Sequence, residues 1–536
     1  MVLKNKISFI FLFISFASIA KITLVLFKNN NKNNDTVATL QTPTAPLVQD
    51  HQTMPNNHKP KSNFSGDKKT GFESITHETP LQKIPYQGTM PTWLKGALIG
   101  TGPAQFEMGP TIAAYWFNGL AMLQAFYFDG VDVSYQSAFL KSTYYNRCIR
   151  QGKFDSSMSN EKPKGFFSRL ASAAFTTPEP YDNGTIGINI INDSYIAMTE
   201  TTLGVEFDPA TLKTKQPFNL NKNLEGHLTT AQFKYDSDEK TWYNYMINFG
   251  TTSAYQIYKI TPDNKHTLIT SLPTKTPSYM RSFAMTKNYI ILIEIPFTIN
   301  PFDLLLGAGA FIEKIQWKPE LGTNFIVINK HTGQRIGDFK TETPFFIFNT
   351  INAYEENNSI VIDAITYANN KIIACTTLKT LRSDNEHEYE PSFVTRFTVN
   401  VPKKTVFHKQ ISLKTVDFPT INETKFMNPY TFIYGIGANL PHKFPHQLLK
   451  INIKKGMTSY WQEDHCFAGK PVFIAKPHAN DEDEGVILSI VFNSATKQSF
   501  LLILDAKTFN ELGRAFVPNP IPLGVMASFN PAFSLH

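Results

Sequence analysis

The sequence contains few cysteines and has little net charge. Cys148, Cys375 and Cys466 are too few for a disulfide framework, and none lies in a CxxC pair of the kind that binds structural zinc. The formal net charge over 536 residues is +7. Residues 1–80 carry nine lysines and five acidic residues, a net +4, which leaves +3 for the rest of the chain. This charge excludes the basic surface of a nucleic-acid-binding protein, so no nucleic-acid partner is expected.

The first 80 residues form an N-terminal arm. Ile7–Ala20 is an apolar stretch behind two lysines, and a second apolar run, Ile22–Phe27, follows Lys21. Residues 1–27 are therefore predicted to be either a cleaved signal peptide or an uncleaved signal anchor, and the protein either secreted or periplasmic, or anchored in a membrane. Residues 28–80 are rich in Asn, Thr, Pro, Gln, His and Lys, which predicts a flexible low-complexity linker.

Beyond this arm, long helical periodicity is scarce. Short β-branched and aromatic runs bounded by polar turn residues recur to the C-terminus, which predicts an all-β fold. Similar hairpins are expected at seven places: 205–209, 233–236, 255–265, 325–338, 397–408, 448–460 and 501–516. Seven such units favour the outer strands of a propeller over a single sandwich, which would be unusually large. Two β-domains in tandem remain an alternative.

Several motifs of this region resemble those of one known family. They include residues 91–96 (PTWLKG), 115–119 (YWFNG), 352–356 (NAYEE) and 434–437 (YGIG). In colinear order from about 85 to 530, the chain resembles the carotenoid cleavage oxygenases. It looks most similar to the branch that holds the animal carotene oxygenases and the visual-cycle retinoid isomerase.

The resemblance implies a fold, a cofactor and a substrate class. The fold is a seven-bladed β-propeller with a helical cap on one face, here assigned to residues 81–536. In this family four neutral histidines hold Fe(II) on the propeller axis, where the metal binds O2 beside the double bond to be cleaved. Three nearby carboxylates accept the other ring N–H of the histidines and fix their orientation. A hydrophobic tunnel brings the apolar polyene in from a membrane surface.

The four iron-ligand positions can be located from their flanking residues, and none of them holds histidine. They are occupied by Gln232, Arg281, Asn349 and Met526. Amide oxygens are weak ligands for a transition metal, and a guanidinium stays protonated and has no lone pair to donate. We therefore expect no iron cofactor in this chain.

The three carboxylate positions have changed in the same direction. Glu200 is retained, the second position holds the shorter Asp417, and the third holds the base Lys470. Three unpaired carboxylates without a metal would repel one another in a low dielectric, whereas two acids and two bases can pair. We expect Arg281 and Lys470 to pair with Glu200 and Asp417 in place of the ion. The alternative is that these four side chains do not meet.

One short segment is a candidate for contact with a membrane. Phe166, Phe167, Leu170 and Phe175 lie in a helical pattern with an apolar face and basic neighbours, similar to the segment with which membrane-docking members of the family enter a bilayer. The same pattern suits a cap helix packed on the propeller.

Two functions from different classes are consistent with these residues. The first is a non-catalytic, iron-free homologue that binds an apolar polyene or another lipid, or acts as a scaffold. The second is an active carotenoid dioxygenase or isomerase with a non-standard metal site, for which His227 is the nearest histidine to a lost ligand position. A glycoside-hydrolysing propeller is not supported, because the acidic cluster 481–484 lies in a predicted polar turn.

Overall fold

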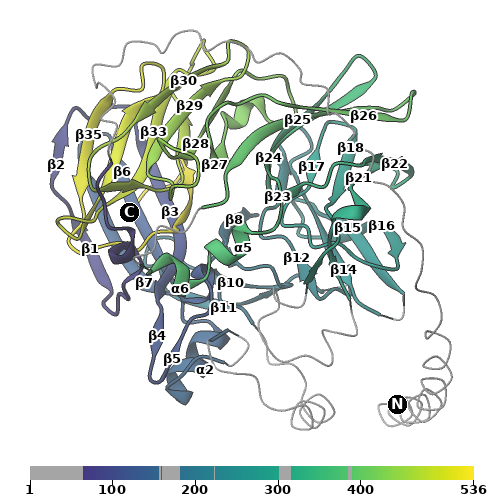
Figure 1. Cartoon of the computed structure of the whole chain (residues 1–536). Helices are drawn as coiled ribbons and strands as arrows, with labels where there is room; N and C mark the ends of the chain where they lie inside the picture. Colours follow the sequence, from purple (N-terminus) through teal and green to yellow (C-terminus); the bar gives the residue numbers. More distant parts are fainter. Residues whose placement is uncertain are drawn as a thin grey trace, which may run out of the picture. The chain divides into compact units, whose positions relative to one another are not determined.

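The structure is a computed structural model that describes residues 64–155, 158–159, 181–222, 224–250, 252–300, 315–383 and 389–535. Within these ranges the strands form seven larger antiparallel sheets and two short hairpins. Figure 1 shows the sheets arranged around a common centre, with the first strands in purple beside the last strands in yellow. The fold is a seven-bladed β-propeller, so the all-β prediction and the propeller prediction are both confirmed.

Each larger sheet is one blade, and the blades follow one another along the chain. Blade 1 consists of β36 (Met526–Asn530), β3 (Lys95–Gln105), β6 (Leu120–Asp129), β7 (Val133–Phe139) and β1 (Thr79–Lys83). Blade 2 consists of β8 (Gly187–Ile191), β9 (Ser194–Met198), β10 (Leu203–Phe207) and β11 (Thr214–Asn219). Blade 3 consists of β12 (Leu228–Thr229), β13 (Lys234–Asp236), β14 (Thr241–Asn248), β15 (Ser253–Ile260) and β16 (His266–Thr274).

The second half of the ring is built in the same way. Blade 4 consists of β17 (Ala284–Met285), β18 (Tyr289–Glu294), β21 (Thr323–Asn329) and β22 (Arg335–Thr341). Blade 5 consists of β23 (Phe346–Glu356), β24 (Ser359–Tyr367), β25 (Ser392–Asn400) and β26 (Thr405–Gln410). Blade 6 consists of β27 (Asp417–Thr420), β28 (Phe432–Gly437), β29 (Gln447–Asn452) and β30 (Met457–Trp461). Blade 7 consists of β31 (Cys466–Ala468), β32 (Val472–Ala475), β33 (Gly485–Asn493), β34 (Gln498–Asp505), β35 (Glu511–Phe516) and β2 (Tyr86–Gly88). The two hairpins are β4 (Glu107–Met108) with β5 (Thr111–Ile112), and β19 (Phe297–Ile299) with β20 (Ile315–Trp317).

The residue pattern of a strand reflects its place in the blade. The middle strands are covered on both faces by neighbouring blades, so all nine residues of β24 and nine of the ten residues of β6 are buried. The outermost strands are open to solvent, and β26 contains only exposed and half-buried residues. Short apolar runs between polar turns are therefore the pattern that this fold requires.

Six of the seven predicted hairpins are the outer strand pairs of blades 2 to 7. The hairpin predicted at 233–236 is instead β13, which pairs with β14 on the inner side of blade 3. The hairpin of blade 1 that β6 and β7 form was not predicted. The pattern of β6 explains the omission, because its nearly continuous burial gives no alternation between apolar and polar residues.

The ring is closed by pairing between the two ends of the folded chain. The last strand, β36, is antiparallel to β3, with Met526 opposite Thr101 and Asn530 opposite Ala97. The N-terminal β2 pairs with β35, so blades 1 and 7 both combine strands from the two ends. A single closed ring excludes the alternative of two β-domains in tandem.

Helices are few and short in the described part of the chain. They are α2 (Thr143–Gln151), α5 (Ile372–Cys375) and α6 (Leu378–Leu381), with 3-10 turns η1 (Lys68–Phe72), η2 (Trp116–Asn118), η4 (Pro319–Leu321) and η5 (Glu423–Lys425). The Ser142 side chain caps the start of α2, and Gly152 ends it with a left-handed φ of 65°.

The folded part begins before residue 81, which corrects the predicted boundary between linker and propeller. Residues 68–72 form η1, and Phe72 is fully buried with its ring 5.2 Å from that of Trp116. The burial of this aromatic side chain fixes a segment whose composition otherwise predicts flexibility. Residues 1–27 lie outside the described residues.

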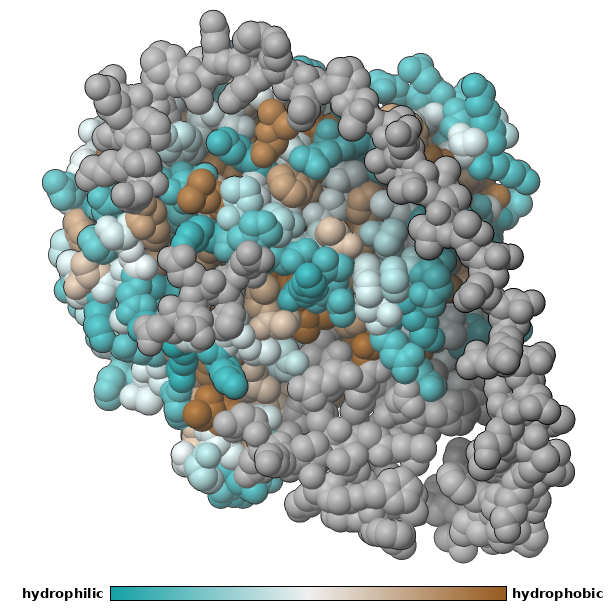
Figure 2. Space-filling model, viewed as in Figure 1, coloured by the Kyte–Doolittle hydropathy of each residue, from teal (hydrophilic) through white to brown (hydrophobic). Residues whose placement is uncertain are grey.

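The visible surface mixes polar and apolar residues. In the described residues on the face that Figure 2 shows, brown apolar side chains are scattered among teal polar ones. Across the residues that the structure describes, no helix has the length and apolar character needed to cross a membrane. The membrane-docking candidates Phe166, Phe167, Leu170 and Phe175 lie outside these residues.

Candidate functional site

The seven positions singled out in the sequence come from seven different blades. Met526 begins β36 in blade 1, Glu200 follows β9 in blade 2, Gln232 lies between β12 and β13 in blade 3, Arg281 precedes β17 in blade 4, Asn349 lies in β23 of blade 5, Asp417 begins β27 in blade 6, and Lys470 lies between β31 and β32 in blade 7. In blades 4 to 6 these are the innermost strands, which contact one another around the ring. This arrangement brings several of these side chains together near the propeller axis.

Arg281 and Glu200 form the ion pair that the sequence predicts. Arg281 Nε lies 3.3 Å from Glu200 Oε1, and the Tyr279 hydroxyl donates a hydrogen bond of 2.6 Å to Glu200 Oε2. Burial raises the pKa of Glu200 above its usual range, while the Arg281 guanidinium and the Tyr279 hydroxyl oppose this rise. Glu200 is thus a desolvated acid that holds its charge through two specific partners.

The Arg281 guanidinium lies between aromatic rings. Its central carbon is 5.5 Å from the ring centroid of Phe348 and 6.0 Å from that of Phe117, which gives two cation–π contacts. The residue is 8% exposed. The backbone is held as well, because the Thr230 hydroxyl of blade 3 donates a hydrogen bond to the Arg281 carbonyl oxygen.

A chain of amide hydrogen bonds connects three further positions. Gln232 Nε2 donates to Asn349 Oδ1 at 2.9 Å, and Asn349 Nδ2 donates to Asp417 Oδ1 at 3.4 Å. The Tyr367 hydroxyl donates to the other oxygen of Asp417, and the Phe418 N–H donates to Asp417 Oδ1 at 2.8 Å. Burial raises the pKa of Asp417, and these donors oppose the rise. Neutral donors therefore satisfy the Asp417 carboxylate.

The backbone at this chain of hydrogen bonds is strained. Phe418 has a φ of 48°, a left-handed conformation that is rare for a bulky residue. The Phe418 N–H is thereby directed at the side chain of the preceding Asp417.

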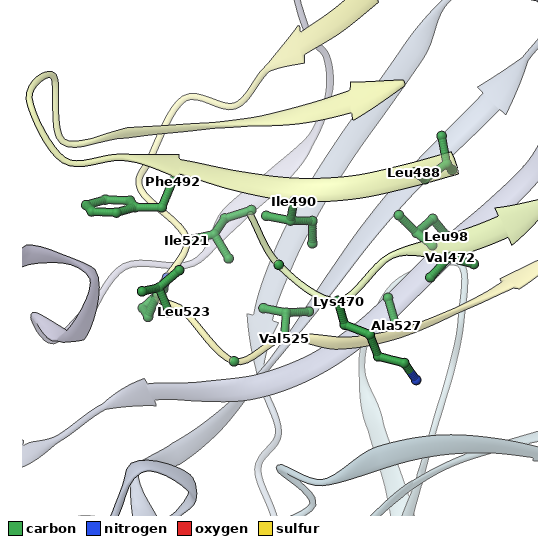
Figure 3. Close-up of a pocket in the computed structure, with 13 residues that line it drawn as sticks. Leu98, Lys470, Val472, Leu488, Ile490, Phe492, Ile521, Leu523, Val525 and Ala527 are labelled. Carbon is green, nitrogen blue, oxygen red and sulfur yellow. The ribbon is translucent and has the colours of Figure 1, made fainter. Parts of the chain in front are cut away.

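Lys470 does not pair with Glu200 or Asp417, contrary to the prediction. Its electrostatic partner is Glu423 in η5, which it shares with Lys234 of β13. No ion pair within 4.0 Å joins Lys470 to an acid of the described chain. In Figure 3 its stem lies along a small apolar cavity of about 20 Å³, and its amine points away from Ile490 and Val525. The position between β31 and β32 directs the amine toward the η5 turn instead.

This second cluster also contains desolvated charges. Burial lowers the pKa of Lys470, and it lowers the pKa of Lys234 to about 8, while Glu423 opposes both shifts. The side chain of Glu423 is nevertheless exposed to water, and those of both lysines are half-buried.

Met526 takes no part in either polar cluster. It lies opposite Thr101 at the edge of blade 1 and is 7% exposed. Within the residues described, it forms no hydrogen bond. The predicted positions that the structure brings together are therefore Arg281, Glu200, Gln232, Asn349 and Asp417. Lys470 faces Glu423 instead, and Met526 joins neither cluster.

Comparisons with known proteins agree with this fold over nearly the whole chain. A profile of the retinal pigment epithelial membrane protein family matches residues 72–531. The β,β-carotene 15,15'-dioxygenase of Gallus gallus is 30% identical over 516 residues, which cover 85% of this chain and 96% of that protein. The chain belongs to the carotenoid oxygenase family. The mitochondrial carotenoid-cleaving dioxygenase of Homo sapiens is also 30% identical, over 83% of this chain and 87% of that protein.

Solved structures of the family support the fold. Cobalt-substituted apocarotenoid oxygenase of Synechocystis superposes with a TM-score of 0.77 at 23% identity, over 87% of this chain and 98% of that chain. At this identity the likeness establishes the propeller architecture alone.

The residues at this site do not fit the Fe(II) of the family. Among the described residues, no group of three or more His, Cys, Asp or Glu side chains is placed to hold a metal ion. Gln232 and Asn349 hydrogen-bond to each other, and Arg281 brings a positive charge that Glu200 already faces. A dication beside this guanidinium would be repelled, and the amides are weak donors for iron.

The nearest histidine does not compensate for the lost positions. His227 Nδ1 accepts a hydrogen bond of 3.0 Å from the Phe249 N–H, so one ring nitrogen is held by the backbone at the end of β14. Its ring also packs against that of Phe249, with centroids 5.6 Å apart. His227 therefore belongs to the packing of blade 3.

Sequence reasoning missed four members of this carotenoid oxygenase family site: Tyr279, Tyr367, Lys234 and Glu423. Two of them carried a local signal, because Tyr279 lies two residues before Arg281 and Lys234 two residues after Gln232, which is the spacing of side chains on one face of an extended segment. Tyr367 and Glu423 carried no such local signal. The pairing register of β23 with β24 positions Tyr367, and the η5 turn positions Glu423.

Proposed function

We propose that this carotenoid oxygenase family protein is an iron-free homologue that does not cleave carotenoids and instead binds an apolar ligand of the polyene or lipid class. One observation carries the proposal: the Arg281 guanidinium, paired with Glu200 on the inner side of blade 4, stands where the resemblance places an iron ligand. A fixed cation cannot donate an electron pair and disfavours a nearby dication.

The surroundings of this guanidinium support an apolar ligand. Phe117 and Phe348 are half-buried, so their rings keep exposed surface close to Arg281. Trp116 stacks on Phe117 at 5.1 Å, and Phe346 contacts Phe348 at 4.7 Å. Apolar surface that faces an internal space gains free energy when an apolar molecule covers it. The relatives named above are described as acting on carotenoids, which are apolar polyenes.

Iron loading tests the loss of the metal. Full-length protein is incubated anaerobically with ferrous iron, freed of excess metal and analysed for bound iron, with a catalytically active family member treated in parallel. We expect far less than one iron per chain and no cleavage of β-carotene. Iron bound at near one per chain, or cleavage products of β-carotene, would establish the alternative function of a dioxygenase or isomerase with a non-standard metal site.

We also propose that the protein acts at a membrane surface. The support is in the sequence alone: the apolar segment 1–27, and Phe166, Phe167, Leu170 and Phe175. Flotation of full-length chain with phosphatidylcholine vesicles tests this proposal, together with a variant that lacks residues 1–27 and a variant with serine at the four docking positions. Recovery of both variants with the vesicles at the level of the intact chain would contradict it.

A further inference from the structure

The Arg281 guanidinium has donor groups that the protein does not use. Its Nε faces Glu200 at 3.3 Å, but no hydrogen bond joins its two terminal nitrogens to any residue that the structure describes. Neither nitrogen is among the fully buried polar atoms that lack a hydrogen-bond partner, so both keep some surface accessible to water. A residue that is 8% exposed thus retains a fork of N–H groups that no described residue occupies.

Nearby acids do not need these donors. Tyr367, Asn349 and the Phe418 N–H satisfy Asp417, and Tyr279 satisfies one oxygen of Glu200. The Arg281 charge opposes the burial-raised pKa of both acids, so Glu200 and Asp417 face the guanidinium electrostatically. The two terminal nitrogens of Arg281 nevertheless form no hydrogen bond with either acid of the described structure, so these N–H groups remain available to an anion.

The shape of the guanidinium selects a partner. Two parallel N–H groups match the two oxygens of a carboxylate, and a contact of this kind is strong in a low dielectric. The flanking faces of Phe117 and Phe348 hold the planar group in place and exclude water from its sides. Beyond the polar tip, the same rings offer apolar surface to the remainder of a ligand.

We infer that Arg281 is a receptor for the carboxylate of an apolar ligand, so that the molecule bound is an amphiphilic acid, such as a long-chain or polyene carboxylic acid, in preference to a hydrocarbon, alcohol or ester. This inference rests on the proposed function, because it assigns the class of ligand to the same site. On this inference the arginine that replaces a metal ligand has two effects: its charge excludes a metal dication, and its N–H groups bind the carboxylate of the ligand.

A matched pair of probes tests the inference. cis-Parinaric acid and its methyl ester have the same fluorescent C18 chain and differ in the carboxylate. Binding to full-length protein in phosphatidylcholine nanodiscs is measured by the rise in fluorescence, with empty nanodiscs subtracted. Because a hydrogen bond to a charged group is strong, we expect the acid to bind about tenfold to a hundredfold more tightly than the ester.

Two variants assign this preference to the guanidinium. Arg281→Met should remove the preference for the acid over the ester, and Arg281→Lys should retain only part of it, because lysine keeps the charge without the fork. Arg335→Met is the matched control, since Arg335 is exposed in β22 and pairs with Asp338. Urea denaturation of each variant shows that it is folded, and the comparison of acid with ester in the unmodified protein needs no variant.

The outcomes separate the two proposals. Equal binding of acid and ester to the unmodified protein would overturn the inference and leave an apolar-ligand protein. An acid preference that survives in both Arg281 variants would place the carboxylate elsewhere and overturn it as well. Binding of neither probe would contradict both the inference and the proposed function.

Discussion

Replacing Arg281 by methionine should destabilise the protein in a way that depends on pH. Methionine keeps the apolar stem and removes the charge that Glu200 faces at 3.3 Å. Removing one partner of a fully buried ion pair costs about 3–5 kcal/mol. Because the Glu200 side chain is 23% exposed, we expect a smaller loss of about 2 kcal/mol in the free energy of unfolding at pH 8.

The sign of the pH dependence follows from the pKa of Glu200. Burial raises this pKa above 4.5, and Arg281 opposes the rise, so the variant has a still higher value. Between pH 4.5 and the folded-state pKa, the folded protein binds more protons than the unfolded chain, and stability falls as pH rises. In the Arg281→Met variant this pH range extends to higher pH, because the pKa of Glu200 is higher there. The loss in the free energy of unfolding relative to the unmodified protein should therefore shrink to about 1 kcal/mol at pH 5, where Glu200 can take up a proton.

Urea denaturation at pH 5 and pH 8, followed by tryptophan fluorescence, measures this difference. A double-mutant cycle with Glu200→Gln should give a coupling of about 1–2 kcal/mol at pH 8, since the two side chains are in contact. Arg335→Met should lose less than about 1 kcal/mol at either pH because it breaks an exposed pair. An equal deficit at both pH values, together with zero coupling, would refute the reasoning.

Three further perturbations test other parts of the ring. Tyr367→Phe removes a hydrogen-bond donor to buried Asp417 and raises the pKa of that acid further. We expect the free energy of unfolding in urea to fall by about 1–3 kcal/mol, and by more at pH 8 than at pH 5. An equal loss at both pH values would contradict this assignment. Lys450→Met leaves the Asp483 carboxylate without its ion-pair partner, since the Lys450 amine lies 2.7 Å from it between blades 6 and 7. We expect the free energy of unfolding to fall by about 3 kcal/mol. A fall below about 1 kcal/mol would show that the pair is not needed for stability. Histidine at Gln232, Arg281 and Asn349 together should create binding of Co(II), seen as visible absorption bands that the unmodified protein lacks. Absence of these bands would mean that the three side chains do not converge.

The fold was largely predictable because the propeller repeats one pattern. In outer strand pairs, β25 for example alternates largely between buried and half-buried residues and β26 between exposed and half-buried residues, and polar turns mark their ends. Blade 1 escaped prediction because β6 is buried along nearly its whole length, so that its sequence is also compatible with other buried elements. The boundary near residue 80 was wrong because one aromatic side chain, Phe72, anchors an otherwise polar segment.

The sequence predicted an interaction at the site only where both partners lie at positions that the family motifs locate. Arg281 and Glu200 come from blades 4 and 2, and their opposite charges at two positions that the flanking motifs locate made the pair foreseeable. The partner of Lys470 was not, because Glu423 reaches it from a 3-10 turn that no residue pattern indicates. Hydrogen bonds between amides, such as that of Gln232 with Asn349, depend on angles that only coordinates supply.

The pairing of β36 with β3 has a consequence for biosynthesis. The strand that closes the ring is the last of its strands to be synthesised, so blade 1 stays incomplete until all the other blades have been made. Until then β3 presents an open edge with unsatisfied backbone groups, which is a template for association with other chains. Nascent protein should therefore depend on chaperones that shield this edge before the polypeptide leaves the ribosome.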